Sequence, residues 1–207
     1  MLEFLTGTGL ASAAGLNAYI PMLMLGLLDR FTSFVELPAA WAWLSADVTL
    51  WIIAGLLVLE VVADKIPVLD SVNDAVQTVI RPAAGGITFA SGMGSETVTV
   101  QDPGALFAGE GWVPVVIGAG IALLVHLFKA TTRAGANTVT AGAAAPVLST
   151  AEDAASTTLA LAAVFLPVVV VLLLIGALVG LWFLAKKLFG RRRRDGSLSA
   201  EDRFYAA

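Results

Sequence analysis

Five charged residues interrupt an otherwise apolar part of the chain between positions 63 and 85. The segment reads ADKIPVLDSVNDAVQTVIRPAAG and contains Asp64, Lys65, Asp70, Asp74 and Arg81. Charged side chains inside a membrane-embedded protein pair with one another or line paths for ions and substrates. These residues therefore rest at a membrane surface or line a polar path between helices.

A pair of acids lies at the start of this segment. Glu60 and Asp64 are four residues apart, so they share one face of a helix and repel each other. Partial desolvation of such a pair suits the binding of a proton or another cation. The alternative is that both acids mark a helix end at the cytoplasmic interface, where charge is tolerated, and that Lys65 or Arg81 neutralises them.

Residues 71–81 have the pattern of an amphipathic helix, because apolar positions recur every three or four residues. The polar face carries Asp70, Asn73, Asp74, Gln77 and Arg81. One interpretation is a helix at the membrane interface, with its polar face in solvent. The other is a helix that continues through Pro82 and turns Gln77 and Arg81 into a cavity.

Prolines predict where helices break. Pro21 leaves the carbonyl of Asn17 without its helical donor, so we expect the first helix to kink there. A second such segment is GANTVTAGAAAP, residues 135–146, which contains Asn137. Broken helices of this kind bind substrates in transporters; alternatively, their glycines and alanines only permit close packing. The candidate breaks are Pro21, Pro67, Pro82 and Pro146, and the candidate polar path is Asn17, Glu60, Asp64, Asp70, Asn73, Asp74, Gln77, Arg81 and Asn137.

Composition places these residues in a membrane protein. Apolar residues make up 58% of the 207 residues, and charged residues make up 14%. A soluble fold could not bury so large an apolar fraction. We therefore predict an all-α, polytopic helical membrane bundle. The chain has no cysteine and one histidine, His126, so a disulfide or a Cys/His metal site is excluded or nearly so. We expect no cofactor, no metal, no catalytic residue and no enzymatic activity, since the acid pair has no companion nucleophile.

Uncharged runs locate the expected membrane segments. Residues 4–28 and 154–185 carry no formal charge and are long enough to cross. Between them lie 48–63, 71–93, 112–129 and 134–148. Six crossings with both termini in the cytoplasm would place 11 of the 12 Lys and Arg residues on the inner side. Four crossings weaken that asymmetry, and 82–93 and 134–148 are short enough to be re-entrant.

Other features concern partners. We expect residues 1–187 to form one transmembrane domain and 188–207 to form a disordered cytoplasmic tail, whose arginines Arg191, Arg192, Arg193 and Arg194 attract anionic lipid. Gly176 and Gly180 have the spacing of a helix dimerisation motif, which would give a homodimer. No aromatic residues interleave the four arginines, so nucleic-acid binding is not expected. His126 is expected to snorkel from a helix end.

The pieces AAGLNAYIP at 13–21 and ADKIP, D-x-x-ND-x-x-Q and IRPAAG within 63–85 resemble an uncharacterised bacterial inner-membrane family, known as a domain of unknown function. The likeness covers roughly residues 4–185. It implies a multi-pass protein of the bacterial inner membrane and brings no reaction or substrate.

Two classes of function follow. A small permease or a lipid or solute translocator agrees with broken helices and polar residues at membrane depth. A non-transporting scaffold or assembly partner agrees with the dimerisation motif and a surface helix. A cavity containing Asn17, Asp74, Gln77 and Arg81 would favour the first, and a solid bundle the second.

Overall fold

The computed structural model describes residues 1–93, 112–176, 179 and 186, with the backbone alone at 67, 68, 70 and 71. In that part every regular element is a helix, which confirms the all-α class. The elements are α1 (Leu2–Leu16), α2 (Tyr19–Phe31), the short 3-10 helix η1 (Ala42–Ser45), α3 (Asp47–Ala63), α4 (Pro67–Gly92), α5 (Trp112–Thr140) and α6 (Ala145–Phe165), followed by the helix Pro167–Gly176. The chain forms two units, Met1–Val170 and Val171–Ala207, and every site below lies in the first.

Helix α1 is the centre of the first unit, because it packs against α4, α5 and α6. Most of its buried residues are small, which lets neighbouring backbones approach closely. A Cβ atom added at Gly15 would lie 2.7 Å from the carbonyl oxygen of Ala122 on α5. Similarly, a Cβ atom at Gly118 of α5 would collide with the carbonyl oxygen of Gly85 on α4. Glycine is therefore required where these helices cross.

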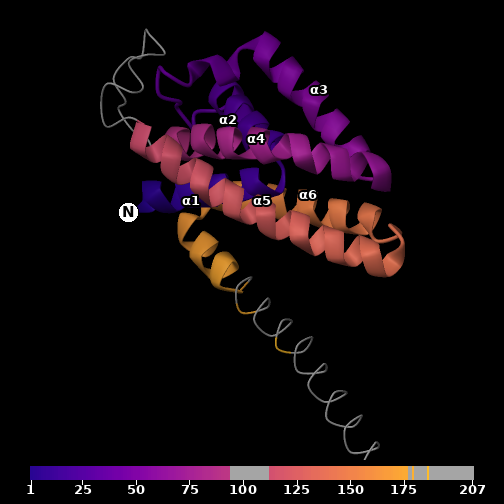
Figure 1. The fold of residues 1–207 in the computed structure, drawn as a ribbon. Coiled ribbons are helices and arrows are strands. Elements are labelled where there is room, and N and C mark those ends of the chain that lie inside the picture. The colour runs from indigo at the N-terminus through magenta and orange to yellow at the C-terminus, as the bar shows by residue number, and fades with distance from the viewer. Residues whose placement is uncertain (94–111, 177–178, 180–185, 187–207) are drawn as a thin grey trace, which may run out of the picture. The chain divides into compact units, whose positions relative to one another are not determined.

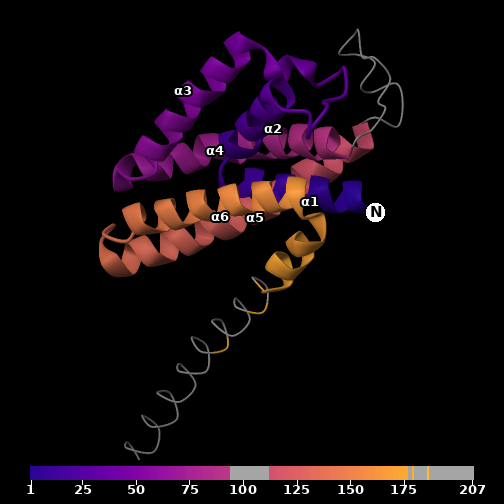
Figure 2. The ribbon, with the colours of Figure 1, turned by 180° about the vertical axis from the view of Figure 1, so that it is seen from behind.

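Helix α4 lies between two groups of elements in both views (Figure 1, Figure 2). On one side are α2, η1 and α3, and on the other are α1, α5 and α6. Helix α4 packs against α5 and α1 extensively and against α3 much less. Residues on α4 can thus reach partners from both groups.

The segment 4–28 is two helices and not one. Helix α1 ends at Leu16, and α2 begins at Tyr19 in a new direction, towards η1 and α3 (Figure 1). Asn17 has extended backbone angles, φ −146° and ψ 120°. The break precedes Pro21 by four residues, at the carbonyl that Pro21 leaves without a donor. Pro67 and Pro146 likewise lie in the first turns of α4 and α6.

The prediction that Pro82 breaks its helix is wrong. Helix α4 runs from Pro67 to Gly92 with Pro82 inside it and includes the amphipathic stretch 71–81. A proline removes one hydrogen bond from a helix. Contacts with α5 on either side of it, Arg81 to His126 and Gly85 to Gly118, hold α4 in one piece.

Two further segment boundaries need correction. Residues 112–129 and 134–148 are not separate segments, since α5 continues through Asn137 to Thr140. The chain reverses afterwards at Ala141 and Gly142, whose φ angles are 52° and 85°, and the Gly142 amide donates to the Asn137 carbonyl at 3.0 Å. The run 154–185 is also interrupted, because α6 ends at Phe165 and Pro167 starts a new helix.

Large apolar side chains lie on the outside of the first unit. Helix α3 shows this most clearly, since its exposed residues include Val48, Trp51, Ile52, Leu56, Val58, Leu59 and Val62. Glu60 on the same helix is only 2% exposed. Among the described residues, α5 is the helix that is both long and apolar enough to cross a membrane.

Candidate functional site

Charged side chains from four parts of the chain meet inside the first unit. We define the ionic network as the residues joined by these ion pairs: Glu60, Asp64, Asp74, Arg81, Lys129, Arg133 and Glu152. Helix α3 and its C-cap supply the first two, α4 the next two, α5 the two after that and α6 the last. Except for Asp74 and Glu152, whose side chains are 15% exposed, these side chains are almost completely buried.

Asp64 joins three elements of the network. Its Oδ1 accepts a hydrogen bond from Asn73 Nδ2 at 2.7 Å. Its Oδ2 accepts from Lys129 Nζ at 3.2 Å and from Arg133 Nη2 at 3.0 Å. Burial alone would raise the pKa of this carboxyl, but the two cations overcome that effect and hold its pKa below the ordinary value. Asp64 is therefore a fixed negative charge.

Arg81 is a cation with several carboxylates in reach. Its Nη2 donates to Glu60 Oε1 at 2.8 Å, while Asp64 and Asp74 lie 3.9 Å and 4.0 Å from the guanidinium. Its side chain is fully buried. The sequence left open whether Arg81 faces solvent or the bundle, and the structure places it in the interior together with Gln77.

Glu152 completes the network from α6. It forms ion pairs with Lys129 at 3.1 Å and with Arg133, whose Nε donates to Oε1 at 3.2 Å and whose Nη2 contacts Oε2. Because Lys129 and Arg133 also bind Asp64, the two cations bridge the C-terminal end of α3 to α6. Removing one partner of such a buried pair is strongly destabilising.

The break between α1 and α2 lies against this network. The last carbonyls of α1 accept hydrogen bonds from network cations: Leu16 from Lys129 at 2.8 Å, and Gly15 from Arg81 at 3.5 Å. A helix C-terminus carries partial negative charge, so cations there are favourable. Asn17 thus lies between a helix end that is satisfied by cations and the start of α2.

Asn17 itself repairs the start of α2. Its Oδ1 accepts from the amides of Tyr19 at 3.1 Å and Ile20 at 3.2 Å. Its Nδ2 donates to Asp153 Oδ1 on α6 at 2.9 Å. The side chain replaces the helical bonds lost at the break and connects that break to a carboxylate.

His126 is buried and does not snorkel, contrary to the prediction. It is 1% exposed, and its Nδ1 lies 2.9 Å from Arg81 Nη1. Arginine only donates, so Nδ1 is the acceptor and the proton belongs on Nε2. That nitrogen lies 3.0 Å from Thr78 Oγ1, which donates to the Asp74 carbonyl at 2.9 Å. His126 is a neutral link from Arg81 to the backbone of α4.

Most members of the predicted polar path converge here. Four of them belong to the network: Glu60, Asp64, Asp74 and Arg81. Three others lie beside it: Asn17, Asn73 and Gln77. Asn137 is half-buried, one helical turn beyond Arg133 on α5. The side chain of Asp70, Gly180 and Arg191 to Arg194 lie outside the described residues. A Cβ atom at Gly176 would meet nothing within 4 Å among the described residues.

Sequence reasoning missed four charged residues of the site: Lys129, Arg133, Glu152 and Asp153. The six-crossing topology places the two cations on the cytoplasmic side and the two acids in an outer loop. A usable signal was present, because His126, Lys129 and Arg133 share a helix face at spacings of three and four. Since both cations are buried in ion pairs, they no longer support a count of crossings.

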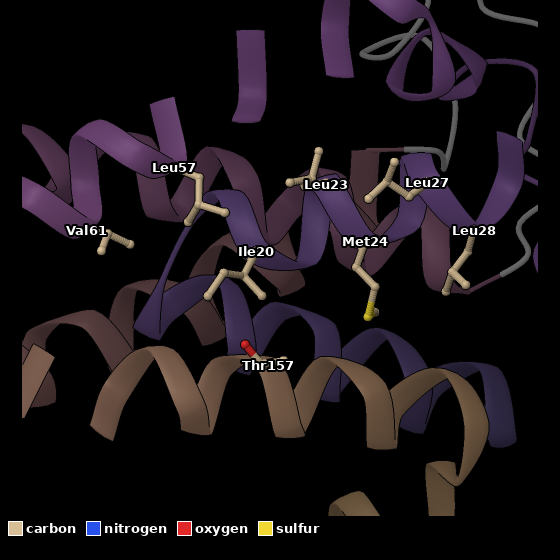
Figure 3. A pocket seen from close by; sticks show the side chains of 8 residues that line it. All are labelled: Ile20, Leu23, Met24, Leu27, Leu28, Leu57, Val61 and Thr157. Atoms are coloured by element: carbon tan, nitrogen blue, oxygen red, sulfur yellow. The ribbon is translucent and has the colours of Figure 1, made fainter. Parts of the chain in front are cut away.

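An open apolar groove of about 430 Å³ lies between α2, α3 and α6. It is lined by Ile20, Leu23, Met24, Leu27, Leu28, Leu57, Val61 and Thr157. Figure 3 shows the lining side chains of α2 between Leu57 and Val61 on one side and Thr157 on the other. None of the lining residues belongs to the network, although Ile20 follows the α1/α2 break directly. Among the described residues, no three His, Cys, Asp or Glu side chains are arranged to hold a metal ion.

The fold and the site together define an all-α protein with an ionic network buried at a broken helix. Residues 4–187 match the family described as Domain of unknown function (DUF4126), so the chain belongs to that family. This confirms the resemblance seen in the sequence. Neither a curated protein nor a solved structure matches the chain.

Proposed function

We propose that the chain is a multi-pass protein of the bacterial inner membrane. The support is an arrangement opposite to that of soluble proteins: large apolar side chains are outside, while Arg81, Arg133 and Asp64 are at most 1% exposed. Soluble monomers rarely expose large contiguous apolar surfaces. In a bilayer the same surface would face lipid, and the charges would pair inside the bundle.

Within the membrane, we propose that the protein is a small translocator of lipids or similar solutes. The observation that carries this is the interrupted helix: the end of α1 and the start of α2 meet at Asn17, where the last carbonyls of α1 contact Lys129 and Arg81. Discontinuous helices form the binding sites of many transporters. The groove beside the break is apolar and suits the acyl part of an amphiphile.

A reconstitution assay tests this function. The protein is placed in phosphatidylethanolamine/phosphatidylglycerol vesicles that contain a fluorescent nitrobenzoxadiazole lipid, and dithionite is added outside. Dithionite bleaches the outer leaflet only, so a translocator increases the bleached fraction beyond that of empty vesicles.

The matched variants are Asp153→Asn and Asp47→Asn. Asp153 accepts the hydrogen bond of Asn17 at the break, whereas Asp47 forms an exposed pair with Arg30. We expect Asp153→Asn to slow lipid exchange and Asp47→Asn to leave it unchanged. Wild-type vesicles that bleach like empty ones would refute a lipid translocator.

A non-transporting scaffold is the second candidate. The scaffold function is favoured by the position of the groove. None of the network residues lines the groove, so the buried charges do not contact the space that a solute would occupy. The ion pairs would then serve to lock α3, α4, α5 and α6 together. In that case the reconstituted protein would move no lipid, and Asp153→Asn would lower thermal stability alone.

A further inference from the structure

Glu60 differs from Asp64, the other carboxylate of the network that is almost completely buried. Its Oε1 accepts one hydrogen bond from Arg81, and its Oε2 has no hydrogen-bond partner among the described residues. Asp64, which is equally buried, accepts three hydrogen bonds. Desolvation without hydrogen bonds penalises the charged form of an acid. Asp74 Oδ1 also lacks a hydrogen-bond partner, but the Asp74 side chain is 15% exposed, whereas that of Glu60 is 1% exposed. Glu60 is thus the less stabilised of the two almost completely buried carboxylates, Glu60 and Asp64.

The charge balance of the network points the same way. Its described members are four carboxylates, on Glu60, Asp64, Asp74 and Glu152, and three cations, on Arg81, Lys129 and Arg133. With all groups ionised, the network carries one negative charge in excess. One added proton makes it neutral.

Arg81 has alternative partners when Glu60 becomes neutral. Asp64 and Asp74 lie 3.9 Å and 4.0 Å from its guanidinium, so a small movement of this side chain exchanges one ion pair for another. Gln77 also has a free acceptor, since its Oε1 lacks a described partner. Protonation of Glu60 therefore leaves no cation of the network unpaired.

His126 is a poor competitor for this proton. Its Nδ1 accepts from Arg81 and its Nε2 faces Thr78. A proton on Nδ1 would place two donors against each other, and the new positive charge would lie beside Arg81. The proton consequently goes to the carboxylate.

We propose that Glu60 takes up and releases one proton that drives translocation, with Arg81 moving towards Asp64 and Asp74 when Glu60 is neutral. This rests on the proposed translocator function. In the step, an O–H bond forms at Glu60 Oε2 while an O–H bond of a hydronium ion from the solvent breaks, which leaves one water molecule. In the described part of the chain, the ionisable groups that face Glu60 and its partner Arg81 are Tyr19, Asp64, Asp74, His126 and Lys129.

Infrared difference spectroscopy tests the proton site directly. The full chain in nanodiscs is titrated with acid, and the carbonyl stretch of protonated carboxyl groups is followed in water and in deuterium oxide. We expect Glu60→Gln to remove the band of one carboxyl group and Glu36→Gln, at an exposed position, to remove no buried band. A Glu60→Gln spectrum identical to that of the wild type would overturn the proposal.

A second measurement needs no variant. Dicyclohexylcarbodiimide is an apolar reagent that reacts with protonated carboxyl groups, and peptide mapping by mass spectrometry locates the adduct. We expect labelling of Glu60 in the unsubstituted chain that increases as the pH falls. Absence of a Glu60 adduct at every pH would overturn the proposal.

The vesicle assay separates this proposal from the function on which it rests. With a pH gradient across the membrane, we expect faster lipid exchange by the wild type and no effect of the gradient on Glu60→Gln. An infrared band at Glu60 without lipid exchange would refute the translocator and keep the proton site. Lipid exchange without an infrared band at Glu60 would keep the translocator and refute the proton site.

Discussion

Replacing Arg81 by glutamine is the sharpest test of the network as a structural unit. The wild-type guanidinium is fully buried and lies 2.8 Å from Glu60, whose side chain is 1% exposed. The substitution leaves the Glu60 carboxylate in the interior without its cation. Breaking a buried pair in this way costs about 3–5 kcal/mol. For a domain of this size, that corresponds to a decrease in Tm of roughly 6–20 °C.

The double variant Arg81→Gln/Glu60→Gln provides the matched comparison. Replacing both partners removes the uncompensated charge, so we expect it to recover most of the lost stability. The assay is thermal unfolding in detergent, followed by circular dichroism near pH 7. At acid pH the loss caused by Arg81→Gln should shrink, because a protonated Glu60 no longer needs a cation.

The exposed pair Arg30 and Asp47 serves as a control, at 2.6 Å but with side chains 37% and 71% exposed. Its loss through Arg30→Gln should change stability by less than about 1 kcal/mol. If the effects of Arg81→Gln and Glu60→Gln simply add to within about 0.5 kcal/mol, the two residues are not energetically coupled. That result would refute the reasoning.

Three other predictions concern packing, the helix break and pH. Gly118→Ala should destabilise by about 1–3 kcal/mol, because the new Cβ atom would collide with the backbone of α4; Gly120→Ala, with nothing within 4 Å, should be neutral or slightly stabilising in the same unfolding assay. Asn17→Ala should cost about 1–3 kcal/mol, since it leaves the amides at the start of α2 unpaired, and hydrogen exchange should increase at those amides; unchanged exchange would contradict this role. The pKa of Asp64 is lower in the folded protein, so its stabilising contribution is present above the ordinary value of 3.8 and is lost as the pH falls below it; Asp64→Asn should flatten this acid limb of a plot of Tm against pH.

Local sequence rules located part of the site correctly. The spacing of Asn73, Gln77 and Arg81 placed them together, since residues three or four apart share a helix face. Pro21 pointed to the break at Asn17 because a missing donor is a local property. The same rule gave a wrong prediction at Pro82, because packing against α5 on both sides of this proline keeps α4 continuous.

The remaining part depends on contacts between distant positions. Asp64 binds Lys129 and Arg133, which follow it by 65 and 69 residues. The residues next to Asp64 and next to Lys129 and Arg133 in the sequence do not indicate that pairing. In addition, charged residues within an apolar stretch have the composition of a loop. For this reason the sequence divided α5 near Lys129, and the topology count used basic residues that are buried.

The order in which the network residues are synthesised has a consequence for assembly in the cell. A nascent chain that ends before α5 contains Glu60, Asp64 and Asp74 but only Arg81 among the network cations. Charged residues at the centre of a membrane helix oppose insertion by about 2.5–3.5 kcal/mol each. The first helices therefore remain incompletely neutralised until Lys129 and Arg133 emerge, and Glu152 closes the network last. In the membrane location that we propose, truncated chains that end between α4 and α5 should accordingly be substrates for quality-control proteases.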